Sequence, residues 1–310
     1  MSGDTMQETA TFTPTPGLRL RAFVELLKPV TWFPPMWAYA CGVVSAGVAT
    51  DGRWGHIAAG VLLAGPLVCG TSQVVNDWYD RHVDAINEPG RPIPSGRIPG
   101  RWGLYLAVAW TLLSLAVAAA LGPIVLGAGI VGLLLAWAYS APPARLKLNG
   151  WYGNAACGFC YESLPWVTGA AVMSAATPDW RVFCVATLYG LGAHGIMTLN
   201  DFKAIEGDTK LGVRTIPVQL GAPRAARLAC WVMAVPQVAV VALLLAWGLP
   251  AHAAGVAAVL LAQFACMPRL LADPRGRAPW YNGTGITLYV SGMMITAFAL
   301  RSGFPTPAGL

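Results

Sequence analysis

Long apolar runs separated by short polar segments dominate the chain from about residue 32 onward. A membrane-spanning helix needs about 20 predominantly apolar residues. Leu121-Gly122-Pro123 divides one overlong run in two, because proline interrupts helical hydrogen bonding. Glu162 and Pro165 interrupt another run. The pattern predicts nine transmembrane helices, at 32–50, 56–77, 102–121, 123–140, 153–175, 181–200, 225–247, 251–271 and 281–300.

The composition agrees with an all-α integral membrane protein. Of 310 residues, 56% are hydrophobic and only 11% are charged, less than half of the roughly 25% typical of soluble domains. A secreted disulfide scaffold, a disordered protein and a nucleic-acid-binding domain are excluded. We expect a single transmembrane domain over 28–310 and a disordered cytoplasmic tail over 1–27, which has no signal-peptide pattern.

The distribution of basic residues predicts the orientation, since loops rich in Lys and Arg stay in the cytoplasm. With nine spans, 17 of the 20 basic residues fall on the side that includes the N-terminus. The exceptions are Arg53, Arg181 and Arg301. The N-terminus is therefore predicted to be cytoplasmic and the C-terminus outside.

The seven cysteines lie mostly in apolar runs, where a free thiol behaves as a small hydrophobe. Cys157-Gly-Phe-Cys160 has the spacing of a redox or metal motif, but no second cysteine pair or histidine lies nearby in the sequence. We interpret these two cysteines as structural.

Acidic residues concentrate in two short stretches at the predicted cytoplasmic ends of the second and sixth spans. Asn76, Asp80 and Asp84 are four residues apart, so they share one helix face. Asp201 and Asp208 are seven apart and are expected to superpose on one face as well. The two stretches hold seven of the fourteen acids: Asp77, Asp80, Asp84, Glu88, Asp201, Glu206 and Asp208.

Carboxylates in this register repel one another and are costly near a membrane, so a cation should hold them. Mg²⁺, bound by one or two carboxylates plus substrate phosphate oxygens, fits this pattern. The alternative is a solvated helix end with surface acids, which explains neither the register nor its repetition.

Basic residues flank both acidic stretches. Arginine forks and lysine charges suit a diphosphate, so the sequence predicts a diphosphate clamp at the cytoplasmic membrane surface. The alternative is that these residues only set the topology. The candidate diphosphate-binding residues are Arg91, Arg97, Arg145, Lys147, Lys203 and Lys210.

The two acidic stretches resemble those of the UbiA superfamily of intramembrane prenyltransferases. Within it, the chain is similar to the branch of chlorophyll and bacteriochlorophyll synthases over nearly its whole length after the tail. Many relatives carry a further aspartate where this chain has Ala204. The second metal site therefore has fewer ligands, or Glu206 substitutes from a turn beside Gly207. The similar segments are 28–37, 75–88, 91–97, 192–203 and 279–285.

The resemblance implies transfer of a geranylgeranyl or phytyl group from its diphosphate to the propionate of (bacterio)chlorophyllide in a bacterial inner, photosynthetic membrane. Mg²⁺ and the bases would neutralise the departing diphosphate. The acceptor carboxylate is already ionised, so no strong base is needed. Tyr79, Tyr139 and Tyr161 either stabilise the allylic cation or simply pack. The implied catalytic and metal-binding set is Asn76, Asp80, Asp84, Asp201 and Asp208, with Glu206 as a further ligand and Tyr139 as a catalytic aromatic.

Two polar residues inside predicted spans are candidates for acceptor binding. His194 precedes Asp201 by seven residues and therefore lies on the same helix face. It either contacts the acceptor, through the chlorin magnesium or the propionate, or makes an interhelical hydrogen bond. Glu162 is either functional, as buried ionisable groups in membranes usually are, or neutral and bonded to a neighbouring helix.

Two other interpretations remain open from the sequence. One is a UbiA-type enzyme that prenylates a quinone precursor or protoheme, which would share the clamp and differ in the acceptor. The other is a transporter or pigment-binding protein without catalysis, which would not need paired acidic faces. No inverted repeat of the transporter kind is evident. The donor in the cell, the number of metals, the oligomeric state and any protein partner are not determined by the sequence.

Overall fold

The computed structural model describes residues 16–303, and it is helical throughout this range apart from connecting turns and one isolated bridge between Asn149 and Arg214. The first half contains α1 (Pro16–Leu26), η1 (Pro29–Thr31), α2 (Phe33–Ser45), α3 (Trp54–Leu62), η2 (Leu63–Cys69), α4 (Gly70–Asn87), α5 (Trp102–Leu121), α6 (Pro123–Ser140) and η3 (Leu146–Leu148). The second half contains α7 (Gly150–Gly158), η4 (Phe159–Ser163), α8 (Leu164–Ser174), α9 (Trp180–Asn200), η5 (Asp201–Ala204), α10 (Ile205–Leu211), α11 (Ile216–Leu220), α12 (Ala222–Ala246), α13 (Pro250–Ala272) and α14 (Pro274–Gly303).

The prediction of an all-α membrane protein is confirmed. Within the described range, seven helical stretches are long and apolar enough to cross a membrane. The predicted spans 102–121 and 123–140 coincide with α5 and α6, because Gly122 and Pro123 separate them. The predicted spans 32–50 and 153–175 correspond to the 13-residue α2 and to the α7–η4–α8 segment, which are not among the seven. The count of nine therefore stays a prediction.

The N-terminal segment departs from the expected disordered tail. Residues 1–15 lie outside the described range, but Pro16–Leu26 forms α1. Ala22 and Leu26 are fully buried and Phe23 packs beside them, so the apolar face of α1 packs against α4. The expectation of disorder is wrong for this part, because apolar residues at helical spacing give the segment a face to bury.

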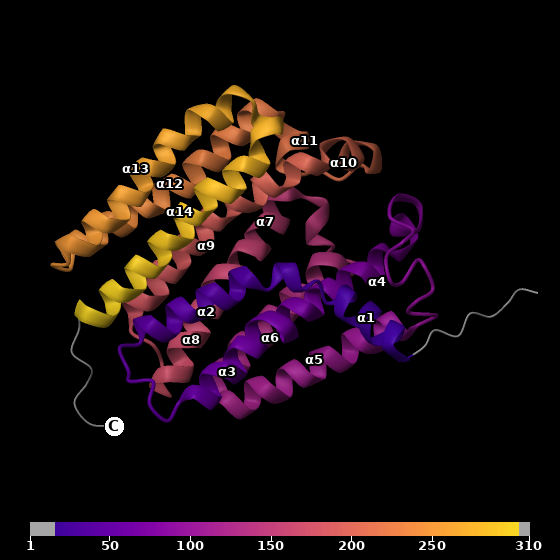
Figure 1. Ribbon diagram of the computed structural model, residues 1–310, viewed down its shortest axis with the longest axis horizontal. Coiled ribbons are helices and arrows are strands. Elements are labelled where there is room, and N and C mark those ends of the chain that lie inside the picture. Colours follow the sequence, from indigo (N-terminus) through magenta and orange to yellow (C-terminus); the bar gives the residue numbers. More distant parts are fainter. Residues whose placement is uncertain (1–15, 304–310) are drawn as a thin grey trace, which may run out of the picture.

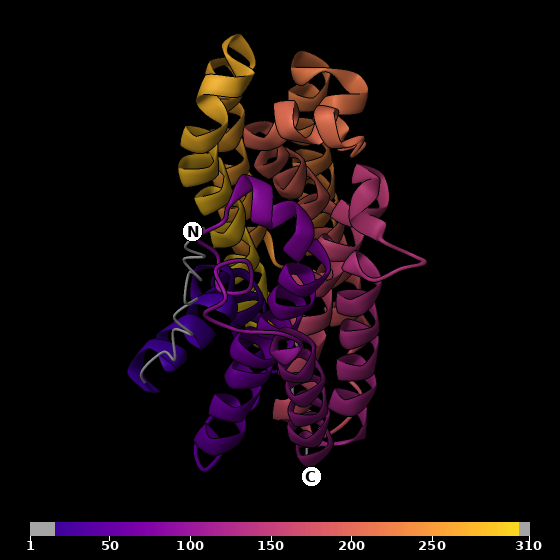
Figure 2. The same ribbon diagram turned by 90° about the vertical axis from the view of Figure 1, so that its right-hand side faces the viewer.

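The helices form two groups joined by a central layer (Figure 1). In the C-terminal group, α9 packs on α12, and α13 packs on both α12 and α14. In the N-terminal group, α4, α5 and α6 pack on one another. Between the groups, α2 contacts α8 and α14, and α7 contacts α9, so α2, α7 and α8 connect the two groups. The view turned by 90° shows the same elongated bundle along its side (Figure 2).

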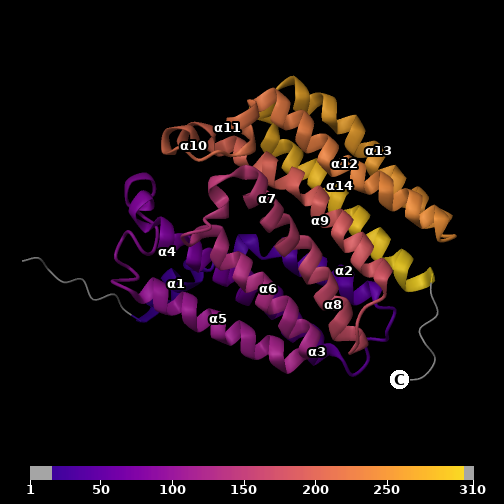
Figure 3. The same cartoon turned by 180° about the vertical axis from the view of Figure 1, so that it is seen from behind.

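One end of the bundle gathers the segments that carry both acidic stretches. The end of α4, the loop that follows it, α10 and α11 lie at this end in opposite views (Figures 1 and 3). We call it the acidic end and define it by residues 76–101, 139–150 and 200–221. Gly212, at φ 71°, ends α10, and the side chain of Asn149 caps α7 by accepting a hydrogen bond from the Trp151 amide.

Two π-helical segments interrupt the helical stretches 54–87 and 150–174. The first, η2, contains Pro66, and the second, η4, is followed directly by Pro165 at the start of α8. Proline has no amide hydrogen to donate, so the regular i to i−4 ladder cannot continue through it. Such single-turn π segments often occur at functional sites.

Candidate active site

The first acidic stretch lies on α4, and its residues are already partnered. Asn76 donates from Nδ2 to Asp80 Oδ2 at 3.1 Å and to Ser140 Oγ at 3.1 Å. Lys147 Nζ, from the loop after α6, donates to both carboxylate oxygens of Asp80 at 2.5 Å. The structure therefore brings the predicted residues Asn76, Asp80 and Lys147 together.

A second set of contacts neutralises the rest of this stretch. Arg91 donates from Nη1 to Asp84 Oδ2 at 2.8 Å and forms a fork with Glu88 through Nε and Nη2. Lys28 Nζ lies 2.6 Å from Asp77 Oδ1, and Asp77 is only 2% exposed. Sequence reasoning missed Lys28 as a partner of Asp77. The signal was present, because a buried aspartate requires a cation from another part of the chain.

The charges of this cluster shift the pKa values of its members outside the helices. Burial alone would lower the pKa of Arg91, but the hydrogen bond to Glu88 and the charges of Asp77 and Asp84 raise it above the usual value. The same hydrogen bond from Arg91 lowers the pKa of Glu88. Burial lowers the pKa of Lys147, and Asp80 opposes that shift.

The second acidic stretch is built differently. Instead of one helix, α9 ends at Asn200, Asp201 begins the 3₁₀ turn η5, and Asp208 lies in the separate helix α10. The expectation that Asp201 and Asp208 superpose on one helix face is therefore wrong. The short turn η5 connects the end of α9 directly to α10, so both carboxylates stay at the acidic end.

Neutral donors alone contact these two carboxylates. Asn154 Nδ2 lies 3.3 Å from Asp201 Oδ2 and also donates to Thr198, and Thr215 donates to Asp208 Oδ2 at 3.3 Å. Within the described range, no basic side chain lies within 4.0 Å of either carboxylate. Both side chains are only partly exposed.

Glu206 does not join this arrangement. Its side chain is 84% exposed on α10, and Oε1 lies 3.9 Å from Arg275 Nη1 on α14. The expected turn beside Gly207 is instead helical, and the helix directs Glu206 outward. Glu206 is therefore not placed to replace the missing aspartate at Ala204.

The remaining predicted bases differ in their surroundings. Arg97 forms a bidentate pair with Glu25 of α1, at 2.6 and 2.8 Å, so it braces α1 rather than facing the acids. This pairing lowers the pKa of Glu25. Arg145 has a left-handed backbone, and its buried Nε has no hydrogen-bond partner. Lys203 and Lys210 are exposed on η5 and α10.

Tyr139 connects the two acidic stretches. It lies at the end of α6 beside Ser140, which accepts a hydrogen bond from Asn76, and its ring faces Gly153 of α7, next to Asn154, which donates to Asp201. A Cβ built on Gly153 would lie 3.2 Å from Lys147 Cα and 3.3 Å from the Leu146 carbonyl oxygen, so the absence of a side chain there lets α7 approach the segment that carries Lys147 closely. Tyr139 is thus positioned between the residues predicted to hold the metal.

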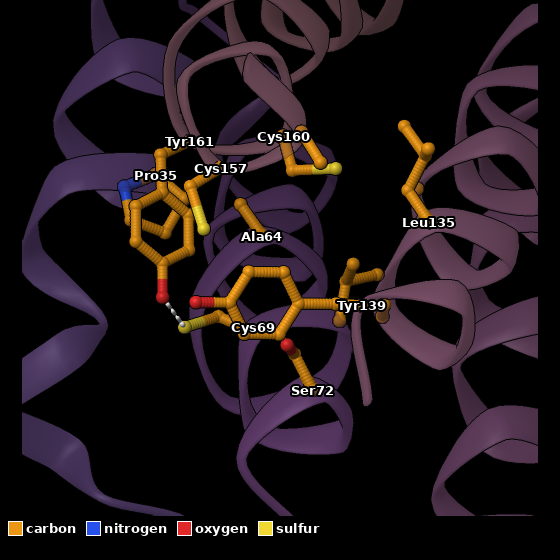
Figure 4. Close-up of a pocket in the computed structure, with 13 residues that line it drawn as sticks. Pro35, Ala64, Cys69, Ser72, Leu135, Tyr139, Cys157, Cys160 and Tyr161 are labelled. Carbon is orange, nitrogen blue, oxygen red and sulfur yellow. Dashed lines mark hydrogen bonds between the residues drawn. The ribbon is translucent and has the colours of Figure 1, made fainter. Parts of the chain in front are cut away.

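An apolar cavity begins at Tyr139 and extends into the bundle. Tyr161 and Tyr139 project into it from different elements, and the Cys69 thiol points to the Tyr161 hydroxyl at 3.8 Å (Figure 4). Tyr79, by contrast, packs edge-on against Trp137. The lining consists of Pro35, Ala64, Val68, Cys69, Ser72, Gly132, Leu135, Ala136, Tyr139, Ala156, Cys157, Cys160 and Tyr161.

The two candidate acceptor residues lie outside this cavity. His194 is half-buried on α9, with its ring centroid 5.7 Å from that of Trp151 on α7. Glu162 is 3% exposed, and its Oε2 atom has no hydrogen-bond partner. Neither side chain lines the cavity that Tyr139 does.

A preformed metal cage is absent from residues 16–303, where no three histidine, cysteine, aspartate or glutamate side chains are grouped to hold an ion. Mg²⁺ does not require such a cage, because it is usually held by one or two carboxylates, waters and substrate phosphates. Asp201 and Asp208, which have no basic partner, fit an ion that arrives with a diphosphate. The donor chemistry of the site is thus compatible with Mg²⁺.

The described residues form a helical membrane bundle with two acidic stretches, adjacent bases and an apolar cavity. This is the organisation of an intramembrane prenyltransferase. Residues 31–290 match the UbiA prenyltransferase family, and the chain belongs to that family.

Comparison with individual proteins shows which members of this family the chain resembles. The bacteriochlorophyll synthase 33 kDa chain of Cereibacter sphaeroides is 60% identical over 281 residues, covering 91% of this chain and 93% of that protein. The chloroplastic chlorophyll synthase of Arabidopsis thaliana is 38% identical, covering 89% and 73%. The solved structure of a UbiA homolog from Archaeoglobus fulgidus bound to GPP and Mg²⁺ shares the fold, with a TM-score of 0.64 at 20% identity over 91% of this chain and 99% of that one.

Proposed function

We propose that this enzyme esterifies the propionate of (bacterio)chlorophyllide with geranylgeranyl or phytyl diphosphate and releases diphosphate. The observation that carries this proposal is the position of Tyr139, which lines an apolar cavity next to both acidic stretches. Its neighbour Ser140 accepts a hydrogen bond from Asn76, and its ring faces Gly153 of α7, where Asn154 donates to Asp201. The 60% identity to a bacteriochlorophyll synthase supports the choice of acceptor. No observation on the structure favours a quinone precursor or protoheme instead.

The diphosphate of the donor binds at the acidic end. Lys147 and Arg145 come from the loop after α6, and the unpartnered Nε of Arg145 offers a donor to a phosphate oxygen. Lys203 and Lys210 add positive charge from η5 and α10. Asp201 and Asp208 would hold Mg²⁺, and Asp80 and Asn76 would contribute to the same site from α4. When bound, Mg²⁺ neutralises charge on the departing diphosphate.

The residues around the allylic carbon then control its reaction. The ring faces of Tyr139 and Tyr161 stabilise positive charge as the C–O bond to diphosphate weakens. The apolar lining below them excludes water, which would otherwise compete with the acceptor. The acceptor carboxylate attacks that carbon and forms the ester. Because the carboxylate is already ionised at neutral pH, the site needs to orient it rather than deprotonate it.

His194 remains our candidate for acceptor contact, because its half-buried imidazole lies beside Trp151 and a flat apolar macrocycle can stack on both rings. Glu162 is sealed within the core, and we assign it no contact with the acceptor. We also propose that the acidic end faces the cytoplasm of a bacterial inner, photosynthetic membrane, as the distribution of basic residues predicts.

The direct test is incubation of membranes containing the full chain with bacteriochlorophyllide or chlorophyllide, geranylgeranyl diphosphate and Mg²⁺. We expect esterified pigment on extraction, and none when the metal is chelated. The matched control is a membrane containing the Asp201→Asn variant. Prenylation of a quinone precursor or of protoheme, with no esterified chlorophyllide, would overturn the proposal in favour of another UbiA-type acceptor.

A further inference from the structure

A second apolar cavity continues the first one deeper into the bundle. It is lined by Leu63, Ala64, Val68, Ala128, Gly129, Gly132, Cys160, Leu164, Pro165 and Thr168. Four of these residues also line the cavity that begins at Tyr139: Ala64, Val68, Gly132 and Cys160. The two cavities therefore adjoin at these four residues, which we call the junction.

The order of residues along α6 shows the direction of the combined space. Tyr139 and Ala136 line only the first cavity, Gly132 lines both, and Ala128 lines only the second. With a rise of 1.5 Å per residue, the junction lies about 10 Å from Tyr139 along the helix axis, and Ala128 lies about 16 Å from it. The two cavities thus follow one another along α6, starting from the acidic end, and share their lining at the junction.

The deeper cavity offers nothing to a polar ligand. No charged side chain lines it, and the hydroxyl of Thr168 already donates to the carbonyl of Leu164 at 2.7 Å. A hydrocarbon is the chemistry that fits such a lining, because burying its methylene groups is favourable while burying an unpaired polar group is costly.

Gly132 determines whether the two cavities communicate. A Cβ atom at this position would lie 3.5 Å from Val68 Cγ1 and 3.6 Å from Leu164 Cδ1. Those are ordinary contact distances, so a methyl group fits, but any larger side chain would have to extend into the junction between η2 and α8. The absence of a side chain at Gly132 keeps that passage open.

We propose that Gly132 sets the length of the donor tail that the enzyme accepts. The proposal rests on the function proposed above, because it assigns the two cavities to the prenyl chain of the diphosphate donor. With the diphosphate at the acidic end, the proximal isoprene units occupy the first cavity. The distal units of a 20-carbon chain pass Gly132 into the second cavity, whereas a 10-carbon chain ends before the junction.

The test compares Gly132→Leu with Gly127→Leu in the full chain. Gly127 lies on the exposed face of the same helix with nothing within 4 Å of its would-be Cβ, so this variant controls for the effect of leucine on α6 itself. The donors are geranyl, farnesyl and geranylgeranyl diphosphate. We expect Gly132→Leu to lower kcat/KM at least about tenfold more for geranylgeranyl than for geranyl diphosphate, since pocket contacts of this kind discriminate by 10-fold or more. Gly127→Leu should leave the preference unchanged.

A volume exchange keeps the test informative if Gly132→Leu folds poorly. Gly132→Val adds side-chain volume on α6, and Val68→Ala removes side-chain volume on the facing η2. Gly132→Val alone should disfavour the 20-carbon donor, and the double variant should recover most of its use. Gly132→Ala should behave like the wild type.

Binding measurements separate this proposal from the proposed reaction. Non-ionisable thiolodiphosphate analogues with 10-, 15- and 20-carbon tails bind without turnover, and their effect on Tm reports affinity. A length-dependent loss in Gly132→Leu supports the assignment of the two cavities to the prenyl chain even if no chlorophyllide ester forms, in which case only the proposed reaction fails. Equal losses for all three tail lengths, or no change in a folded variant, would overturn the role of Gly132.

Discussion

The two acidic stretches look alike in the sequence but differ in how the fold treats their charge. On α4, Asp77, Asp80 and Asp84 each have a lysine or arginine within 3.0 Å. Within residues 16–303, Asp201 and Asp208, which follow α9, accept side-chain hydrogen bonds only from Asn154 and Thr215. The first stretch is paired with basic side chains, and within the described residues the second has no basic side chain within 4.0 Å.

This difference indicates that the two acidic stretches have different roles. A partly buried carboxylate without a basic partner is unfavourable in the empty protein, which makes it a strong binding site for an added cation. A carboxylate already paired with lysine or arginine contributes to holding the loops in place. We therefore infer that the second stretch is the primary anchor for Mg²⁺, and that the first stretch organises the bases around the diphosphate.

The largest expected effect is on catalysis, in Asp201→Asn. Loss of the carboxylate removes the anchor for the metal, and activity should fall at least about 100-fold, as when a key electrostatic group is removed. Stability should be unchanged or slightly higher, because an unpaired charge is removed. Esterification rate and Tm in detergent are the measurements. More than a tenth of wild-type activity at saturating Mg²⁺ would contradict the inference.

The next effect concerns the stability of the first stretch. Asp80→Asn and Lys147→Met each leave one charge of a mostly buried pair alone, and each should cost about 1–3 kcal/mol, reduced from the value for a fully buried pair by partial exposure. The double variant should lose less than the sum of the two. Thermal unfolding of all four proteins gives the coupling. Additive losses would show that the pair contributes nothing to the fold.

A smaller effect is expected where a predicted diphosphate ligand serves to brace α1. Arg97→Gln breaks the bidentate pair with Glu25, which is partly exposed, so unfolding should become easier by no more than about 1 kcal/mol. The KM for the donor should change less than it does in Lys147→Met. Steady-state kinetics of the two variants under the same conditions decide the point. A larger rise in KM for Arg97→Gln than for Lys147→Met would indicate that Arg97 binds the diphosphate.

The smallest effect is expected for Glu206→Gln. This side chain is 84% exposed, so stability should change by less than about 0.5 kcal/mol. Activity and the Mg²⁺ concentration that gives half-maximal rate should match the wild type. A several-fold rise in that concentration would place Glu206 among the metal ligands and remove the contrast between it and Asp201.

Local signals in the sequence predicted much of the fold correctly. The break between α5 and α6 follows from Gly122 and Pro123, since a residue at φ 122° and a following proline cannot continue a helix. Asn76 and Asp80 meet on α4 because residues four apart share a face of any regular helix. The apolar runs located the membrane helices because a bilayer requires them whatever the packing.

The geometry of the second acidic stretch was not predicted correctly from local signals. Extending helical spacing from Asp201 to Asp208 assumed that α9 continues, and it does not. The chain turns at Asp201, where Thr198 and Asp201 both contact Asn154 of α7, and this is a tertiary arrangement with no local signature. The same applies to Arg97, whose partner Glu25 is 72 residues away.

The sequence by itself determined that this chain is a helical membrane protein, and which residues carry its scarce charge, because hydropathy and helical spacing are local properties. Only the tertiary structure decided which carboxylates receive a basic partner and which do not. It also decided that two adjoining apolar cavities follow α6 from Tyr139 past Gly132. Charge pairing and cavities depend on which helices become neighbours, and neighbours far apart in the chain are chosen by packing as a whole.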